Sequence, residues 1–127
     1  MADPLAATHK AIYTVLNTAM SIDVYDYVPQ NASYPYVEIE RSVASSEDSL
    51  VAQKDNVFTF VTIWSDYKGQ KEILEQMETA YAALHRQKLA LDNGNMVECM
   101  VQMRDTSRDV NDKTFIGSLT VRSLVEH

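Results

Sequence analysis

The spacing of hydrophobic residues predicts two helices. The first begins at Pro4, which suits a first helical turn, follows Asp3 as a candidate N-cap, and ends between residues 17 and 21. Its apolar stripe consists of Leu5, Ile12, Val15, Leu16 and Ala19. The second helix is expected over residues 68–86, where charged residues surround a second apolar stripe. That stripe consists of Ile73, Leu74, Met77, Tyr81 and Leu84.

Five runs rich in β-branched and aromatic residues predict strands. They span residues 24–28, 34–41, 57–64, 96–104 and 114–125. The first two runs are expected to pair, with residues 29–33 as their connection. The third run is apolar on both faces, which places it at the centre of a sheet or under another subunit. In the last run, Phe115, Leu119, Val121 and Val125 share one face with the small residues Gly117 and Ser123.

The segment 42–56 differs from its surroundings because it is polar and its apolar residues show no sustained period. It is predicted to be a long loop or mobile arm of about fifteen residues, a length that is unusual in a compact domain unless it is functional. A mostly antiparallel sheet of four to five strands, with both helices on one face, would bury every apolar stripe. The predicted fold is therefore an α+β two-layer sandwich in one domain of residues 1–127.

The composition indicates a folded, acidic protein. Hydrophobic residues make up 46% of the 127, which is ordinary for a globular chain. Eleven basic residues against eighteen acidic ones give a formal net charge of −7, which disfavours electrostatic binding to nucleic acid or to an anionic membrane. No stretch approaches the ~20 apolar residues that span a bilayer, and no secretory signal is expected at the N-terminus.

Residue patterns typical of catalysis or of metal binding are missing from the sequence. The three glycines are too far apart to form a phosphate-binding loop. His9, His85 and His127 lack the spacing of metal ligands and are interpreted as solvated surface residues. We therefore expect no catalytic residue, no cofactor and no metal site, and a protein that is not an enzyme. A constellation of residues assembled only by the fold remains an alternative.

The segment after the fourth strand has a functional and a structural interpretation. Oxygen-bearing side chains alternate from Asp105 to Asp112, as they do in a calcium-binding loop. Val110 and Ile116 stand where that loop carries a glycine and a glutamate. A solvated hairpin loop over residues 105–113 is therefore the favoured interpretation.

The chain has one cysteine, Cys99, which excludes an internal disulfide framework and a cysteine-based zinc site. Cys99 alternates with Val97, Val101 and Met103 along the fourth predicted strand. This pattern predicts a buried core residue rather than a reactive thiol.

Aromatic residues are concentrated between positions 25 and 67, in excess of what one face of a small sheet needs. They are Tyr25, Tyr27, Tyr34, Tyr36, Phe58, Phe60, Trp64 and Tyr67. Tyrosine and tryptophan bury a large area while keeping a polar group, which suits protein interfaces. Two interpretations stay open: at least two of these residues serve an interface, or half of them fill the core.

The order of short motifs resembles that of the phage tail-completion family. These are the tail terminator proteins, also called neck or head–tail joining proteins, of long-tailed phages and of phage-like gene transfer agents. The resemblance covers residues 5–125. Its motifs are Val24-Tyr25-Asp26, Val28-Pro29-Gln30, Tyr34-Pro35-Tyr36-Val37, Phe60-Val61-Thr62-Ile63-Trp64-Ser65, Tyr67-Lys68-Gly69, Leu84-His85, Arg104-Asp105 and Gly117-Ser118-Leu119-Thr120-Val121-Arg122.

The resemblance implies a structural role in the virion, in its tail or neck, after assembly in the cytoplasm of a bacterial host. Members of this family form a ring, commonly of six subunits, at the head-proximal end of the tail tube. The ring stops addition of tube protein and presents a surface to the head connector. The implied partners are further copies of the chain, the tail tube protein and the head connector or stopper protein, with no membrane. The negative charge would let DNA pass through the lumen without specific binding.

Candidate contacts for a subunit or partner interface lie in the aromatic region, the arm, the end of the fourth predicted strand and the hairpin loop after it. They are Tyr36, Glu47, Asp48, Leu50, Val51, Trp64, Tyr67, Arg104 and Arg108. Two other functions stay open. One is a small-molecule-binding or enzymatic α+β domain that uses the aromatic cluster as a pocket, and the other is a different neck protein, such as a head-completion subunit.

Overall fold

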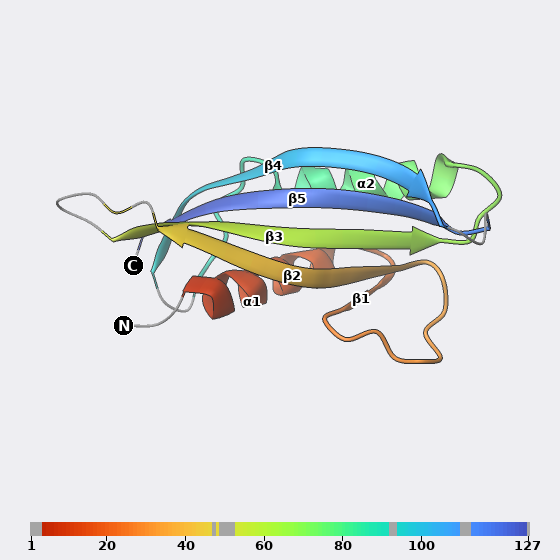
Figure 1. The fold of residues 1–127 in the computed structure, drawn as a ribbon, viewed down its shortest axis with the longest axis horizontal. Coiled ribbons are helices and arrows are strands. Elements are labelled where there is room, and N and C mark those ends of the chain that lie inside the picture. The colour runs from red at the N-terminus through yellow and green to blue at the C-terminus, as the bar shows by residue number, and fades with distance from the viewer. Residues whose placement is uncertain (1–3, 47, 49–52, 92–93, 110–112, 127) are drawn as a thin grey trace.

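The computed structural model describes residues 4–46, 48, 53–91, 94–109 and 113–126. Within them the chain forms two helices and five strands (Figure 1). The elements are α1 (Pro4–Ala19), β1 (Asp23–Tyr25), β2 (Tyr36–Ser46), β3 (Lys54–Ser65), α2 (Lys71–Leu84), β4 (Asn95–Arg108) and β5 (Phe115–Glu126). The expected start of the first helix at Pro4 is confirmed, while the proposed cap Asp3 lies outside the described residues.

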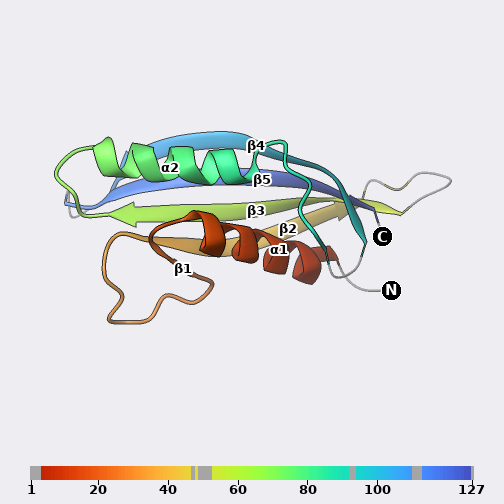
Figure 2. The ribbon, with the colours of Figure 1, turned by 180° about the vertical axis from the view of Figure 1, so that it is seen from behind.

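The strands form one sheet in the order β1-β2-β3-β5-β4. All neighbouring strands pair antiparallel except β1 and β2. Both helices lie on the same face of this sheet, as the two opposite views show (Figures 1 and 2). The predicted α+β two-layer sandwich is therefore confirmed, and neither of the two described helices covers the other face of the sheet.

The core lies between the helices and the covered face of the sheet. Along β5 every second residue is buried, so the predicted grouping of Phe115, Leu119, Val121 and Val125 with Gly117 and Ser123 is confirmed. The buried helix residues that meet this face include Ile12, Leu16, Ile73, Met77 and Leu84. Two members of the predicted stripes lie elsewhere, because Ala19 and Leu74 are exposed.

Gly117 allows α2 to approach the sheet closely. A Cβ atom at this position would lie 2.6 Å from Sδ of Met77 and 3.1 Å from Cγ1 of Ile73. Both distances are shorter than ordinary van der Waals contact, so only a residue without a side chain fits the present spacing. The small residue in the predicted stripe therefore sets how near the helix packs.

The first two strands pair as expected, but they run in the same direction. Asp23 is opposite Tyr36 and Tyr25 is opposite Glu38, in parallel register. Residues 26–35 form a loop that returns the chain to the starting end of β1 before β2 begins, which a tight hairpin turn does not do (Figure 1). The connection is thus longer than the predicted segment 29–33.

The predicted fifteen-residue arm is wrong for most of its length. β2 continues to Ser46 and β3 begins at Lys54, with Ser46 opposite Asp55 and Ser42 opposite Thr59. The polar side chains led to the wrong prediction. A strand requires only hydrogen bonds between backbones, and polar residues allow these equally well where both faces of the sheet are exposed to solvent. Residues 42–46 and 54–56 therefore form the end of a long β-hairpin.

The fourth strand is also longer than predicted. Residues 105–108 belong to β4 and pair with residues 115–118 of β5, so the oxygen-bearing side chains lie on a strand rather than in a loop. Two irregularities, between Met96 and Glu98 and between Val101 and Met103, shift the register. They break the simple alternation on which the prediction for Val97 and Met103 depended, because each bulge transfers the following residues to the opposite face.

Candidate assembly surfaces

The uncovered face of the sheet carries the side chains that alternate with the buried ones. On β3 it presents Asn56, Phe58, Phe60, Thr62 and Trp64, while Val57, Thr59, Val61, Ile63 and Ser65 point to the helices. By register, the neighbouring strands add apolar side chains to this face: Tyr36, Val43, Met100, Met103, Ile116 and Leu124. The prediction that the third strand is apolar on both faces is therefore confirmed. An apolar sheet face without a covering layer is typical of an interaction surface.

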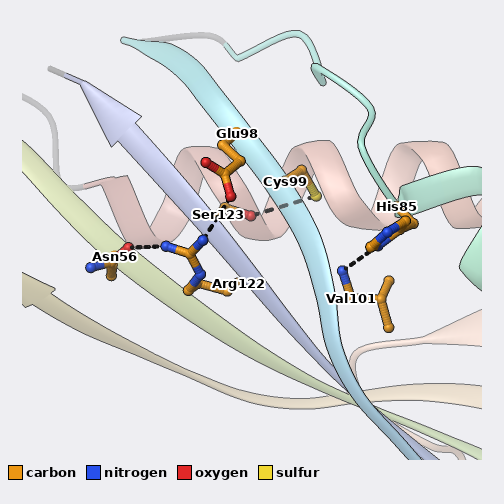
Figure 3. A network of polar contacts seen from close by, with 7 residues as sticks. All are labelled: Asn56, His85, Glu98, Cys99, Val101, Arg122 and Ser123. Carbon is orange, nitrogen blue, oxygen red and sulfur yellow. Dashed lines mark hydrogen bonds and ion pairs between the residues drawn. The ribbon is translucent and has the colours of Figure 1, made fainter.

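The charged residues near the middle of this face are paired within the chain. The Arg122 guanidinium donates one hydrogen bond to Oδ1 of Asn56, at 3.1 Å, and one to Oε1 of Glu98, at 2.7 Å (Figure 3). The Arg41 guanidinium lies 4.5 Å from the centre of the Phe60 ring, an attractive cation–π geometry. A partner that covers this region therefore leaves these two cations with their intrachain contacts.

Four aromatic rings form a cluster at the end of the sheet where β3 finishes. We refer to Tyr25, Tyr34, Tyr36 and Trp64 as the aromatic cluster. Tyr36 stacks on Tyr34 at 5.4 Å and on Trp64 at 6.3 Å between ring centroids, and Tyr25 meets it edge-on at 5.9 Å. The three ring contacts join all four side chains through Tyr36.

The aromatic cluster is flanked by carboxylates. Burial raises the pKa of the Glu38 carboxyl, Glu40 raises it further, and the Trp64 indole lowers it. The indole N–H of Trp64 is buried without a hydrogen-bond partner among the described residues, so its effect on Glu38 is electrostatic and is not that of a well-formed hydrogen bond. Burial likewise raises the pKa of the Tyr36 hydroxyl, with smaller contributions from Tyr34 and Glu38. Burial is the largest cause of both raised pKa values, and the neighbouring acidic groups add to it.

The opposite edge of the sheet is β4, and a column of stacked groups stands beside it. The Arg104 guanidinium lies 4.0 Å from the centre of the Tyr81 ring, and Tyr81 stacks on His85 at 4.5 Å. His85 Nδ1 accepts a hydrogen bond from the backbone N–H of Val101 at 3.1 Å (Figure 3). The N–H of Arg86 donates to the carbonyl of Cys99 at 2.7 Å. His85 is therefore a half-buried residue that contacts the sheet edge, and its interpretation as a solvated surface histidine is wrong.

A groove of about 410 Å³ separates α2 from the outer part of β4. It is lined by Leu74, Met77, Glu78, Tyr81, Arg104, Asp105 and Thr106. Leu74 is half-exposed in this groove, because its side chain points away from the core and toward the solvent-exposed side of the β4 edge. Its spacing in the sequence matches the core stripe, so periodicity alone could not separate it from Ile73 or Met77.

The predicted interface residues fall in separate places. Tyr36 and Trp64 lie together in the aromatic cluster, whereas Arg104 lies on the opposite edge. Arg108 lies at the end of β4 with its guanidinium 4.8 Å from the Phe115 ring centre. Tyr67 is exposed after β3, and its N–H bonds to Oγ of Ser65. Of the arm residues, Asp48 accepts a hydrogen bond from the N–H of Lys54, while Glu47, Leu50 and Val51 lie outside the described residues.

None of the eight aromatic residues between positions 25 and 67 is fully buried. Their side chains are half-buried or exposed, so the interpretation that half of them fill the core is wrong. Six exposed apolar side chains lie toward the two sides of the sheet. They are Tyr27, Tyr34 and Val43 on the β1–β2 side, and Leu74, Val97 and Met103 on the β4 side. The sequence placed Tyr27 and Tyr34 in the aromatic concentration but gave Leu74, Val97 and Met103 a core pattern.

Features that suggest chemistry are sparse in the described part of the chain. Cys99 is buried, as predicted, beside Ser123 Oγ at 3.8 Å, and burial raises the pKa of its thiol, which disfavours the reactive thiolate. No group of three His, Cys, Asp or Glu side chains in the described residues is placed to hold a metal ion. None of the described helices has the length and hydropathy of a membrane span.

Comparison with known proteins places the whole chain in a family. The sequence profile of the family described as tail completion protein gp17 matches residues 5–126. No curated protein sequence matches the chain significantly. Among solved structures, a chain from the virion of a native gene transfer agent (GTA) particle has the same fold, with a TM-score of 0.87 and 19% identity over 99% of this chain and 100% of that one. Since the family profile spans nearly the whole sequence, the expected resemblance is confirmed and the chain belongs to the tail completion protein gp17 family.

Proposed function

We propose that the protein is a tail terminator, a structural virion protein that forms a ring at the head-proximal end of the tail tube. Membership of the tail completion family supports a structural role in completing the tail. We further propose that this ring contains six copies, stops the addition of tube protein and joins the tail to the head connector. The fold shared with a chain of a gene transfer agent virion is consistent with assembly in such a particle.

The observation that carries this proposal is the apolar uncovered face of the sheet. Phe58 and Phe60 lie on its central strand, with Val43, Met100 and Leu124 on the strands around them. Burying such side chains against another protein removes apolar surface from water and contributes roughly 25 cal/mol per Å². In the proposed virion this face contacts another virion protein or a neighbouring copy.

The net charge supports a role at a DNA passage. Each copy carries a formal charge of −7. Where carboxylates line the lumen of a ring, they repel the phosphate backbone, so the genome passes without binding. The protein therefore contacts DNA only transiently in this proposal and reads no sequence.

The β2–β3 hairpin is proposed as a second contact, made with a neighbouring subunit or with the tube end. Its last described rungs carry Ser45, Ser46 and Asp55, and Asp48 at its tip bonds to the backbone of Lys54. The sequence adds Glu47, Leu50 and Val51 between the two strands. This mixture of carboxylates and small apolar groups suits a protein contact better than a solvated turn.

The test is the phenotype of tails assembled with a variant that disrupts the uncovered face. Phe58→Asp places a charge on the central strand, and Ala82→Asp, on the exposed side of α2, is the matched control. We expect Phe58→Asp to fold, by circular dichroism, but to be lost from tails, which electron microscopy shows as overlong and without heads. Ala82→Asp keeps tails of normal length. Tails of normal length that merely lack heads would overturn the terminator role in favour of another neck function, and tails unaffected by loss of the protein would overturn both.

A further inference from the structure

The sheet edge formed by β4 is occupied at its middle and open beyond it. At the middle, the carbonyl of Cys99 accepts a hydrogen bond from the N–H of Arg86 at 2.7 Å. The N–H of Val101 donates one to Nδ1 of His85 at 3.1 Å (Figure 3). These backbone groups of β4 therefore point outward, away from β5, and the segment after α2 occupies them.

The outward groups of the next part of β4 belong to Arg104 and Thr106. The N–H of Asp109 donates to the carbonyl of Thr114 at 2.8 Å, so residue 109 points inward, and backbone groups alternate between the two sides of a strand. The bulge that shifts the register in the middle of β4 gives the same assignment from the other end, because it displaces the alternation by one residue. The outward N–H and C=O groups of Arg104 and Thr106 form no hydrogen bond with the described part of the chain.

This open part of the edge lies beside the groove between α2 and β4. The α2 side of the groove is largely apolar and includes Tyr81 and Leu74, which is 50% exposed. By register Arg104 and Thr106 face the helix side of the sheet, so they line the β4 side of the groove. An extended chain laid along the open edge would therefore direct every second side chain toward this groove.

We propose that the open part of β4 receives an extended segment of a different virion protein, which adds a strand to the sheet and places an aliphatic side chain in the groove. This inference rests on the proposed function, in which the protein contacts the tube and the connector as well as its own copies. An added strand supplies backbone partners for Arg104 and Thr106, and the groove selects the side chain. The groove has two carboxylates, Glu78 and Asp105, and one guanidinium that already lies on Tyr81, so an acidic segment is disfavoured.

A second copy of this chain fits the open edge less well than a different protein does. The described sheet has two edge strands, β1 and β4. β1 has three residues, the lower limit for a strand, so it offers little backbone for pairing. Pairing of β4 with β4 of another copy would be two-fold, so it would end at a dimer and could not repeat around a ring.

Hydrogen–deuterium exchange, read by mass spectrometry, tests whether a strand is added. The amides of Arg104 and Thr106 are expected to exchange about 10-fold or more slowly in purified tails than in the isolated protein. Equal exchange in both would overturn the proposal. Protection that is already complete in assemblies of this protein alone would also overturn it, because a second copy would then occupy the edge. Wild-type protein missing from the tails would instead remove the proposed function.

A proline on the open edge tests the same contact by function. Thr106→Pro removes an outward N–H and no β4–β5 hydrogen bond, and Thr106→Val, which keeps the N–H, is the matched control. We expect Thr106→Pro to fold, by circular dichroism, and to associate with its own copies as the wild type does, by native mass spectrometry. The yield of complete particles should fall about 10-fold or more, whereas Thr106→Val stays near the wild type.

A charge in the groove provides a second variant that does not depend on the edge strand. Leu74→Asp, at a half-exposed helix position, is expected to lower the particle yield as Thr106→Pro does, while Ala82→Asp on the exposed side of α2 does not. Normal yields from folded Thr106→Pro, or from Leu74→Asp where the proline variant does not fold, would overturn the added strand and leave the terminator role standing. Weaker association between copies of Thr106→Pro would assign the edge to a second copy and overturn the proposal.

Discussion

The two faces of the sheet are both rich in apolar residues but are built from different kinds of side chain. The covered face uses aliphatic and small residues, and Val57, Ile63, Val121 and Val125 on it are 0% exposed. The uncovered face adds aromatic rings and arginines, such as Phe60 beneath Arg41, to aliphatic residues such as Ile116 and Leu124, and its side chains are mostly half-buried. Aliphatic side chains interdigitate with helices at high density, whereas aromatic rings and arginine stems cover each other and remain able to contact a partner. Aromatic rings and arginines therefore mark the face that no described helix covers.

The same truncation on the two faces of β5 gives the largest expected contrast. Leu119 is 1% exposed on the covered face, and Leu124 is half-buried on the uncovered face. Leu119→Ala is expected to lower the free energy of unfolding by about 2–5 kcal/mol, because it leaves a cavity under the helices. Leu124→Ala should lower the free energy of unfolding by about 1 kcal/mol or less, because this side chain is already partly exposed to solvent. Urea titration measures both, and equal losses would contradict the division between the faces.

Enlarging a residue on β5 gives the next contrast. Gly117→Val is expected to lower the free energy of unfolding by about 1–3 kcal/mol, because the new side chain collides with Met77 and Ile73 and displaces α2. Ser118→Val, one residue further and on the uncovered face, meets no helix and should be close to neutral. Thermal unfolding of the two variants checks the prediction, and a stable Gly117→Val protein would mean that α2 shifts without cost.

Removing the central cation of the uncovered face should have a smaller effect. Arg122→Met keeps an unbranched apolar stem but removes the bonds to Asn56 and Glu98. Because Arg122 and Glu98 are partly solvated, the variant is expected to lose about 0.2–1 kcal/mol of its free energy of unfolding. The difference in stability between the wild type and the variant should become smaller in high salt. Urea titrations at low and high ionic strength measure it. An advantage that does not change with salt would show that packing, rather than charge, accounts for the effect.

The smallest expected effect is the pH dependence caused by Glu38. Its pKa is raised in the folded protein by burial and by Glu40, so the native state holds this proton more tightly than the unfolded chain does. Stability from this group is therefore present below the usual pKa of a glutamate and is lost as the pH rises through the raised value. Glu38→Gln should be slightly more stable than the wild type at pH 7, by under about 0.5 kcal/mol, and should lose that advantage in acid. Melting curves over this pH range test the sign, and an advantage that grows in acid would contradict it.

The sequence was sufficient to predict the elements whose period is regular. The last strand was identified with its buried face, because Phe115 to Val125 alternates without interruption. The fourth strand was misjudged where bulges interrupt the alternation, since a bulge depends on pairing with β5 and leaves no mark in local hydropathy. The hairpin beyond Ser42 was taken for a loop because its polar residues face solvent on both sides. Polarity reports exposure, and an exposed strand has the same composition as a loop.

The assembly surfaces were predictable by residue type but not by position. Tyr36 and Trp64 were predicted as interface residues because an excess of aromatic residues does not fit a small core, and the structure places both in the aromatic cluster on the uncovered face. The rung that joins Tyr36, Trp64, Ile116 and Ser107 requires the strand order and the register, which join residues far apart in the chain. Sequence spacing carries no information about which residues share a rung across four strands.

The bonds from His85 and Arg86 to β4 also bear on the storage of free subunits before any tail exists. An open edge strand attracts strands from other molecules and starts irregular aggregates. Here the amide of Val101 and the carbonyl of Cys99, in the middle of the long edge, are already occupied by the segment that follows α2. A newly made subunit therefore cannot extend its sheet along the whole edge through this strand. The occupied middle of the β4 edge therefore disfavours irregular strand-to-strand aggregation of the free protein.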